Sequence, residues 1–284
     1  MNRIILILGS GGQIGAYLTD YLNKIGYEVL EFDIVNGLHH DMTEIPNPEL
    51  HRKIMLSHFV FFLAFDVGGS HYLKKYQHTF KFINNNARMM ANVFGLLEKY
   101  DKPFVFASSQ MSNMSYSPYG VMKRVGELYT KSLGGLIVKF WNVYGIENDM
   151  EKAHVITDFI RKGFETGVID MMTDGTESRE FLYAEDCCEG LEAVMGNYDR
   201  LTSDDELHIT TGNSTTILEI AHIIQKLFSN IGKEIVIKPA ESKDEVQKDA
   251  KNVSDPYIQK FWRSTTSVKE GLTKVFYEMK KNYE

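Results

Sequence analysis

Cysteine is almost missing from this sequence. Two of its 284 residues are cysteines, and they are the neighbours Cys187 and Cys188. Adjacent cysteines make a poor disulfide pair, and no C-x-x-C or Cys/His cluster supplies the ligands of a metal site. The composition therefore excludes a disulfide-stapled scaffold, and it predicts a protein of a reducing compartment that binds no metal.

Long apolar runs and runs of basic residues are missing as well. No apolar stretch reaches membrane-spanning length, and the chain starts directly with an apolar strand that leaves no room for a signal peptide, so we expect a cytoplasmic protein. The net charge of −7 without a basic run argues against nucleic acid or a membrane as the partner. A local basic pocket for a phosphate is compatible with this charge.

A glycine turn near the start is the first positive signal. The apolar run 4–8 reads as a strand buried on both faces, and apolar residues at helical spacing follow the turn. Gly9, Gly12 and Gly15 have the roles expected in a diphosphate-binding turn: a tight bend, close approach of the backbone to phosphate, and close packing of helix on strand. The helix N-terminus then offers its N–H groups to an anion.

Asp33 strengthens this interpretation. It ends an alternating strand and follows Gly12 by about twenty residues, the spacing of the acid that binds an adenosine ribose. A carboxylate there repels a 2′-phosphate, so we expect NAD (NAD+/NADH), tightly bound, rather than NADP. The alternative is that Asp33 only caps the next turn.

Strands and helices alternate through the first half, which predicts an α/β fold: a Rossmann-type doubly wound parallel sheet with a smaller interleaved substrate-binding lobe. We expect the NAD-binding domain to comprise 1–145 plus 184–211, and the lobe 146–183 plus 212–284. The tract 241–254 is charged, and we expect it to be exposed. Asp41 and Met42 are expected to form a wall of the adenine site.

Ser109, Tyr119 and Lys123 are the candidate catalytic residues. On a helix, Tyr119 and Lys123 share a face, and an ammonium beside a phenol lowers the pKa of the phenol. Such a tyrosine exchanges a proton with a sugar hydroxyl while hydride passes between the same carbon and nicotinamide. Ser109 orients that hydroxyl. Taken alone, Y-x-x-x-K is more often an exposed helix pair.

Over nearly its whole length the chain resembles the extended short-chain dehydrogenase/reductases that act on nucleotide sugars, the NAD-dependent epimerase/dehydratases. Besides the glycine turn, Asp33 and the catalytic trio, the matching pieces are Leu63-Ala64, the motif 142–145, and 179–183 followed by Asp186. The pieces 67–69, 154–156 and 175–181 look most like the branch that contains GDP-fucose synthase and GDP-mannose 3,5-epimerase.

The resemblance implies a role for each matching residue. Asn142 would touch the sugar or its phosphates, and Arg161 or Lys162, with Arg179, would neutralise the diphosphate of a GDP-linked sugar. The remaining expected cofactor residues are Gln13, Ile14, Leu63, Ala64 and Asn86. Tyr119 and Lys123 are expected to contact the cofactor as well, Lys123 at the nicotinamide ribose. The remaining substrate residues are Val67, Gly68, Gly69, Ser70, Gln110, Met111, His154 and Val155. The histidine at the position of His154 acts as an acid in this branch, or His154 only binds a sugar hydroxyl. Asn86 either binds near the nicotinamide or caps a helix. Ser70 either faces the sugar or completes a turn.

Two departures narrow the chemistry. Just after the catalytic hydroxyl, family members that dehydrate the sugar carry acidic residues, and the 3,5-epimerases carry a cysteine two positions after it. This chain has Gln110 and Met111 at those positions, and neither can take a proton from carbon. We therefore expect hydride transfer at C4, as a sugar-nucleotide 4-dehydrogenase or 4-epimerase. The alternatives are a 3,5-epimerase/4-reductase of a 4-keto GDP-sugar and a non-catalytic NAD-binding regulator. Only nine residues separate Ser109 from Tyr119, so a loop that usually covers the sugar is missing.

The helices expected at 82–100 and 117–133 carry more apolar residues than one buried face needs. In the family these two helices pair across a two-fold axis. The resemblance therefore implies a homodimer.

Overall fold

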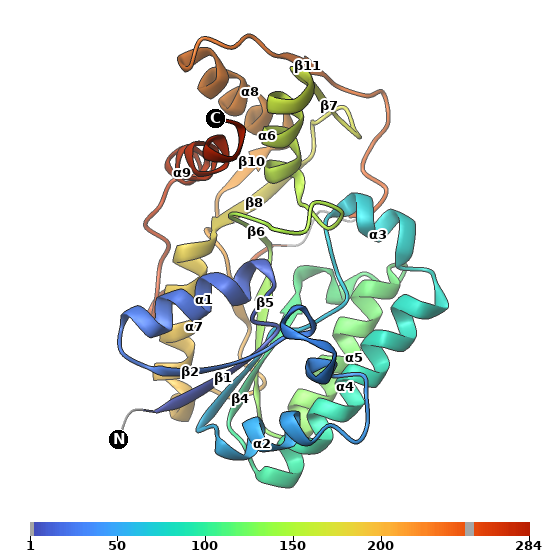
Figure 1. Cartoon of the computed structure of the whole chain (residues 1–284), viewed down its shortest axis with the longest axis vertical. Coiled ribbons are helices and arrows are strands. Elements are labelled where there is room, and N and C mark those ends of the chain that lie inside the picture. Colours follow the sequence, from blue (N-terminus) through green and yellow to red (C-terminus); the bar gives the residue numbers. More distant parts are fainter. Residues whose placement is uncertain (1–2, 248–252) are drawn as a thin grey trace.

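The computed structural model describes residues 3–247 and 253–284. Its centre is a six-stranded sheet of order β2-β1-β3-β4-β5-β9, in which every neighbouring pair is parallel (Figure 1). The expected doubly wound α/β fold is confirmed. The strands are β1 (Ile4–Leu8), β2 (Glu28–Phe32), β3 (Phe59–Phe62), β4 (Phe104–Ser109), β5 (Leu136–Phe140) and β9 (Leu207–Ile209).

Helices cover both faces of this sheet because its strands are apolar on both sides. In β1, Ile5 and Ile7 face one buried cluster, and Leu6 and Leu8 face another. The first cluster includes side chains of α1 and α7, the second those of α2 and α4, with α5 packed beside it. The bounds are α1 (Gln13–Lys24), α2 (Pro48–Leu56), α4 (Phe80–Tyr100), α5 (Pro118–Ser132) and α7 (Ala184–Gly196).

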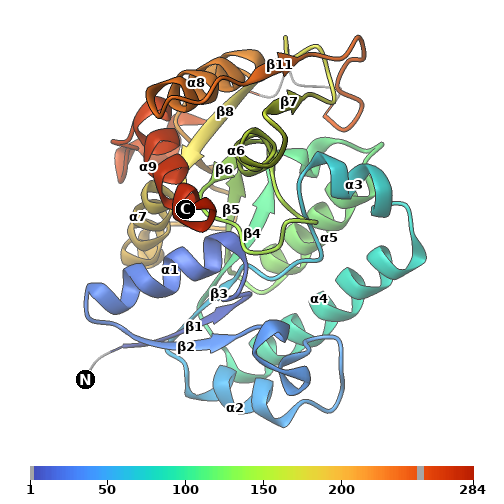
Figure 2. The same ribbon diagram turned by 45° about the horizontal axis from the view of Figure 1, so that its top comes forward.

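A second part of the chain packs over the carboxyl edge of the sheet (Figures 1 and 2). It contains a three-stranded sheet of order β10-β8-β6 and the parallel pair β11-β7. A separate apolar cluster, with Phe159, Phe181, Phe228 and Phe276, fills its centre. Its elements are β6 (Asn142–Tyr144), α6 (Val155–Thr166), β7 (Val168–Asp170), β8 (Ser178–Tyr183), β10 (Ser214–Thr216), α8 (Ile217–Asn230), β11 (Val236–Lys238) and α9 (Val268–Lys280).

The division into 1–145 plus 184–211 and 146–183 plus 212–284 stays a proposal. β6, which that division leaves with the NAD-binding domain, pairs with β8. The sequence patterns do not predict α2, α3 (Ser70–Tyr76) or β10. For α2 a signal was present, because Asn47 accepts a hydrogen bond from the backbone of Leu50 and Pro48 opens the helix.

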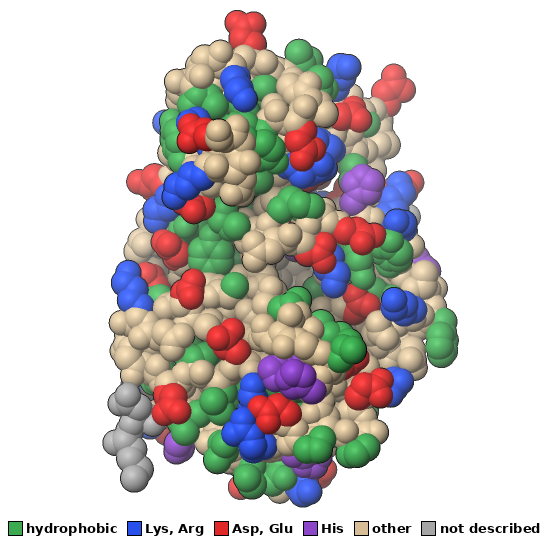
Figure 3. Space-filling view, viewed as in Figure 1, with side chains coloured by type: hydrophobic (Ala, Val, Ile, Leu, Met, Phe, Trp, Pro, Cys, Tyr) green, Lys and Arg blue, Asp and Glu red, His purple; other side chains and the backbone are tan. Residues whose placement is uncertain are grey.

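Acidic and basic side chains are interspersed over the face drawn in Figure 3. Within 3–247 and 253–284, the structure has no helix with the length and apolar character that crossing a membrane requires.

Candidate active site

One cleft of about 1200 Å³ runs along the carboxyl ends of the parallel strands. The turn after β1, the loops after β3 and β4, and segments of the second part line it. In doubly wound sheets this edge is where ligands bind. All but one of the expected site residues line the cleft, and the exception is Asn86.

The glycine turn after β1 has no room for side chains at two positions. Gly9 has a φ of 93°, and a Cβ there would lie 2.6 Å from the backbone nitrogen of Ala64. A Cβ at Gly15 would lie 2.0 Å from the carbonyl oxygen of Gly9, so α1 packs directly on the turn. At Gly12, which caps α1, a Cβ would meet only that carbonyl, at 3.4 Å. This position leaves space for a diphosphate at the helix N-terminus.

Asp33 holds the same turn from the end of β2. Its carboxylate accepts hydrogen bonds from the backbone nitrogens of Gly11 (3.0 Å) and Val35 (3.1 Å). The turn-capping role is therefore present, and the residue also lines the cleft. An acid beside a glycine turn fits the ribose and diphosphate of a dinucleotide, so the residues present fit NAD.

The other cofactor-side residues lie around this turn. The side-chain amide of Gln13 hydrogen-bonds the backbone of Gly145, which joins the glycine turn to the second part of the molecule. The remaining expected residues that line the cleft on this side are Ile14, Asp41, Met42, Leu63 and Ala64.

The structure brings Ser109, Tyr119 and Lys123 together at the cleft, with side chains only 7%, 8% and 3% exposed. Ser109 is the last residue of β4, and Tyr119 lies in the first turn of α5. Ser117 caps that turn by accepting a hydrogen bond from the backbone of Gly120. Because a buried cap and a strand end fix these side chains, the trio is held by regular structure.

The expected effect of Lys123 on Tyr119 is wrong for this structure. Burial raises the pKa of Tyr119 to about 12, although a hydrogen bond with Ser109 acts in the opposite direction. The Lys123 ammonium donates to the carbonyl of Ala107 (2.6 Å) and lies 3.8 Å from the centre of the Phe65 ring. Burial lowers the pKa of Lys123 to about 7, against the charge of Glu127.

Packing explains this correction. The four-residue spacing does place both side chains on one face of α5, but the Phe65 ring packs edge-on against Tyr119 and receives the ammonium of Lys123. The Lys123 nitrogen lies 5.8 Å from the centre of the Tyr119 ring. The sequence pattern did not predict that Phe65 would pack against both Tyr119 and Lys123.

A segment from far along the chain covers the part of the cleft where Ser109 and Tyr119 lie, the part expected to hold the sugar. Residues 242–247 line it, and Val246 is buried in one cluster with Met111 and Tyr119. The Gln110 amide donates to the Gln247 side chain at 3.1 Å. The expectation that 241–254 is exposed is wrong for Val246, because its side chain packs in one buried cluster with Met111 and Tyr119. Residues 248–252 lie outside the described residues.

The loop after β3 forms another wall. Val67, Gly68, Gly69 and Ser70 all line the cleft. A Cβ at Gly69 would lie 2.4 Å from the carbonyl oxygen of Ala153, so the loop touches the segment before α6.

Buried polar contacts fix that loop. Asn86, which is fully buried, accepts from the backbone nitrogen of Asp66 (2.7 Å) and donates to its carbonyl oxygen (3.2 Å). The Asp66 carboxylate in turn accepts a hydrogen bond from Tyr72 (2.5 Å). Asn86 therefore fixes the backbone of the loop after β3 without lining the cleft itself.

The expected diphosphate-binding cations have different surroundings. Arg179 is 6% exposed and its guanidinium contacts Asp244 at 2.5 Å, in the segment that covers the cleft. Arg161 is held on its own helix by Asp158 and Glu165, each at 2.7 Å. Arg179 is thus the more deeply placed cation, and its anionic partner belongs to the covering segment.

Two further expected residues lie beside these cations. Lys162 pairs with Asp158 at 2.7 Å. Asn142, at the start of β6, donates a long hydrogen bond of 3.5 Å to the carbonyl of Glu180. Both line the cleft.

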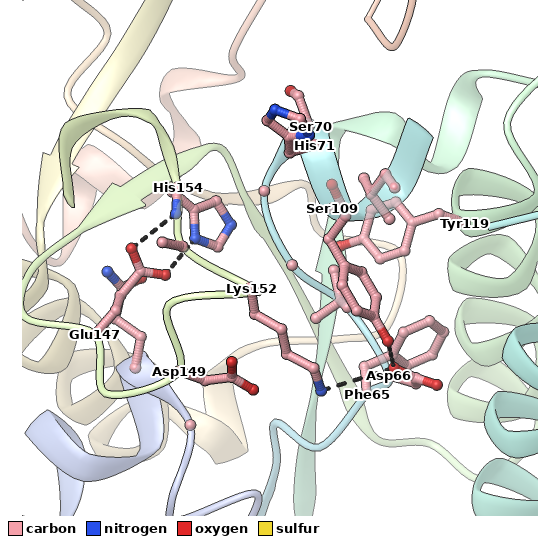
Figure 4. Close-up of a pocket in the computed structure, with 18 of the residues that line it drawn as sticks. Phe65, Asp66, Ser70, His71, Ser109, Tyr119, Glu147, Asp149, Lys152 and His154 are labelled. Carbon is pink, nitrogen blue, oxygen red and sulfur yellow. Dashed lines mark hydrogen bonds and ion pairs between the residues drawn. The ribbon is translucent and has the colours of Figure 1, made fainter. Parts of the chain in front are cut away.

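His154 and Val155 begin α6 and line the cleft from the second part. Sequence reasoning missed the partner of His154, Glu147, whose carboxylate lies 2.6 Å from Nδ1 of the imidazole (Figure 4). A carboxylate seven residues upstream in an irregular loop has no spacing rule to reveal it.

The sequence profile of the NAD dependent epimerase/dehydratase family matches residues 5–210. The chain belongs to this family. Its members are NAD-dependent enzymes of the nucleotide-sugar epimerase/dehydratase type, and solved relatives hold NAD or NADH. NAD is therefore the cofactor of this family member, as expected.

Individual relatives cover nearly all of this epimerase/dehydratase. A protein of Methanocaldococcus jannaschii, provisionally named UDP-glucose 4-epimerase, is 26% identical over 98% of this chain and 99% of its own. The epimerase of Methanothermobacter thermautotrophicus has a TM-score of 0.86 at 20% identity (99% and 93% covered). A GDP-6-OMe-4-keto-L-xylo-heptose reductase from C. jejuni has 0.82 at 17% identity (100% and 99%). These two structures show the shared fold.

Proposed function

We propose that this protein carries out NAD-dependent oxidoreduction at C4 of a nucleotide-activated sugar, as a 4-dehydrogenase or a 4-epimerase. The observation that carries the proposal is the composition of the sugar side of the cleft. Ser109 and Tyr119 meet there, while the neighbouring Gln110 and Met111 offer no group that removes a proton from carbon.

In this proposal the phenolate form of Tyr119, which the hydrogen bond from Ser109 favours against burial, takes the proton of the C4 hydroxyl, and Ser109 holds the same oxygen. NAD, when bound, supplies the hydride acceptor. The Lys123 nitrogen lies 5.8 Å from the centre of the Tyr119 ring and 3.8 Å from the centre of the Phe65 ring. Arg179 meets the diphosphate of the nucleotide, and its contact with Asp244 is exchanged for that anion.

A second candidate is reduction of a 4-keto nucleotide sugar. Burial keeps Tyr119 protonated, with a pKa of about 12, which is the form that donates a proton to a keto oxygen. The fold shared with the C. jejuni GDP-heptose reductase supports this direction. Epimerisation at C3 or C5 has no support from Gln110 and Met111.

We favour a GDP-linked sugar and a homodimer. The GDP preference rests on the sequence resemblance, and UDP-linked sugars are the competing substrates. The dimer would form through α4 and α5, where Ile83 (39%), Val121 (43%) and Leu128 (55%) are exposed. Light scattering of the wild type and of Leu128→Glu tests this: a dimer for the first and a monomer for the second are expected, and a monomeric wild type contradicts it.

The function is tested by denaturing the purified protein to identify released dinucleotide, which we expect to be tightly bound NAD(H). GDP-, UDP-, CDP- and dTDP-sugars, and their 4-keto forms, are then added while the NADH band at about 340 nm is followed. A lasting rise with one sugar indicates a dehydrogenase, an epimeric product without lasting change an epimerase, and a fall with a keto sugar a reductase.

Tyr119→Phe should lower turnover by roughly 10²–10⁴-fold, the usual contribution of a positioned acid/base group. The matched control is Tyr116→Phe, which changes a nearby half-exposed tyrosine. A protein with no dinucleotide and no response to any sugar, or full turnover by Tyr119→Phe, contradicts an enzyme of this kind and favours a regulatory NAD-binding protein.

A further inference from the structure

The loop between β6 and α6 contains a carboxylate–imidazole pair. Glu147 contacts His154 twice: Oε1 lies 2.6 Å from Nδ1 of the ring, and Oε2 accepts from the backbone nitrogen at 2.8 Å. The Glu147 side chain is 7% exposed, whereas that of His154 is 42% exposed and lines the cleft. The carboxylate therefore fixes the ring from its buried side.

This geometry decides which ring nitrogen is available to a ligand. Because Nδ1 faces a carboxylate, it carries a proton, and only Nε2 is left for the cleft. Among the described residues, none forms a hydrogen bond with Nε2. Figure 4 shows the His154–Glu147 pair on one wall and Ser109 and Tyr119 on the other.

The loop that carries the pair is itself fixed. The backbone nitrogen of Gly69 donates to the carbonyl of Lys152 at 2.9 Å, and a Cβ at Gly69 would lie 3.0 Å from the Cα of His154. The Lys152 ammonium lies 3.7 Å from the Asp66 carboxylate across the same gap. These contacts fix the position of the His154 loop relative to the loop after β3.

Charges around the ring favour its protonated form. Burial lowers the pKa of His154, but the charge and the hydrogen bond of Glu147 outweigh burial, and the pKa is raised above its ordinary value. The other titratable groups that line the cleft on these elements include Asp149, Glu151 and Lys152 on the loop itself, Asp66 and His71 after β3, and Asp158, Arg161 and Lys162 on α6.

We infer that Glu147 is a positioning residue that holds Nδ1–H of His154 and favours the imidazole form protonated on both nitrogens, in which Nε2–H is offered to an oxygen of the sugar. The role of the sugar rests on the proposed function; the state of the imidazole does not. His154 then selects sugars with an acceptor oxygen opposite Tyr119. It loses this bond as pH rises through the pKa of the imidazole.

Histidine ring NMR signals of the free protein test the first half, with His154→Asn used for assignment. His154 should titrate above about 6.5, the ordinary value. In Glu147→Gln its pKa should fall below that value, in Glu147→Asp it should stay above, and Glu151→Gln, a change of an exposed acid in the same loop, should not move it. Titration of wild-type His154 below about 6.5, or no change in Glu147→Gln, overturns the inference.

Kinetics with the sugar found in the panel test the second half. At about pH 7, Glu147→Gln should raise KM by roughly 10-fold with kcat changed less than about threefold, because one charge-assisted hydrogen bond is weakened. The wild-type KM should rise with pH, and that dependence should flatten in Glu147→Gln. A pH-independent wild-type KM overturns the sugar contact. If no sugar is turned over, the proposed function fails, and the NMR titration still decides the role of Glu147.

Discussion

The two ends of the cleft are built in different ways. At the cofactor end, the glycine turn and Asp33 come from one β-α-β unit, and the hydrogen bond from Gly11 to Asp33 joins residues 22 apart. At the sugar end, the bond between Gln110 and Gln247 joins residues 137 apart, and Arg179 and Asp244 are 65 apart. Local geometry makes the first end and tertiary packing makes the second, so sequence patterns reveal the first more completely.

Asp33 gives the largest expected effect at the locally built end. Asp33→Asn removes a charge that accepts from two backbone groups and that we propose to contact the cofactor ribose. The dissociation constant for NAD should therefore rise by roughly 10–100-fold, at about 1.5–3 kcal/mol for hydrogen bonds to a charged group. Use of NADP should improve relative to NAD. Glu31→Gln, an exposed acid of the same strand, should change neither constant. Unchanged NAD binding in Asp33→Asn would remove the ribose role.

At the sugar end, Arg179 and Arg161 differ in the carboxylates that they already contact, so their variants can be compared. Arg179→Met should weaken binding of nucleoside diphosphates by about 10-fold, since a charge-assisted contact is lost while Asp244 is also released. Arg161→Gln should change binding less than about twofold, because Asp158 and Glu165 already occupy that guanidinium. Calorimetry with GDP and UDP measures both, and equal losses in the two variants would contradict the ranking.

The burial of Lys123 can be tested through the pH dependence of the free energy of unfolding. Its folded pKa of about 7 lies below the ordinary value of about 10.5, so the unfolded chain binds more protons between these values and wild-type stability rises with pH across that window. Relative to Lys123→Met, the wild type should be least stable below about pH 7 and should gain on the order of 1 kcal/mol per pH unit above it.

Urea unfolding of the two proteins from about pH 6 to 9 measures this difference. Lys131→Met on the same helix is the control, because its ammonium pairs with Asp204 near the surface and should give no such slope. A wild-type-minus-Lys123→Met difference that stays constant with pH would show that burial does not lower the pKa of Lys123.

Sequence reasoning went furthest where a short segment carries its own geometry. The central strands, their connecting helices other than α2, and the glycine–acid pair could be predicted because apolar periodicity and turn chemistry act over a few residues. The positions of Ser109, Tyr119 and Lys123 followed from a strand end and a helix start. The direction of the Tyr119 pKa did not follow, because it depends on how deeply the fold buries the ring and on where Phe65 packs.

The sequence by itself determined the α/β fold, the family and the glycine turn that we expect to bind NAD, since each depends on the local spacing of residues along the chain. Only the tertiary structure decided what covers the cleft beside Tyr119, what Lys123 contacts and where the carboxylate of Glu147 lies. Val246 reaches Tyr119, and Glu147 reaches His154, through chain paths with no regular period. The Val246 contact exists only after two separately folded surfaces meet, and the Glu147 contact depends on the path of one irregular loop. In both cases burial and electrostatics act between residues that no short pattern connects.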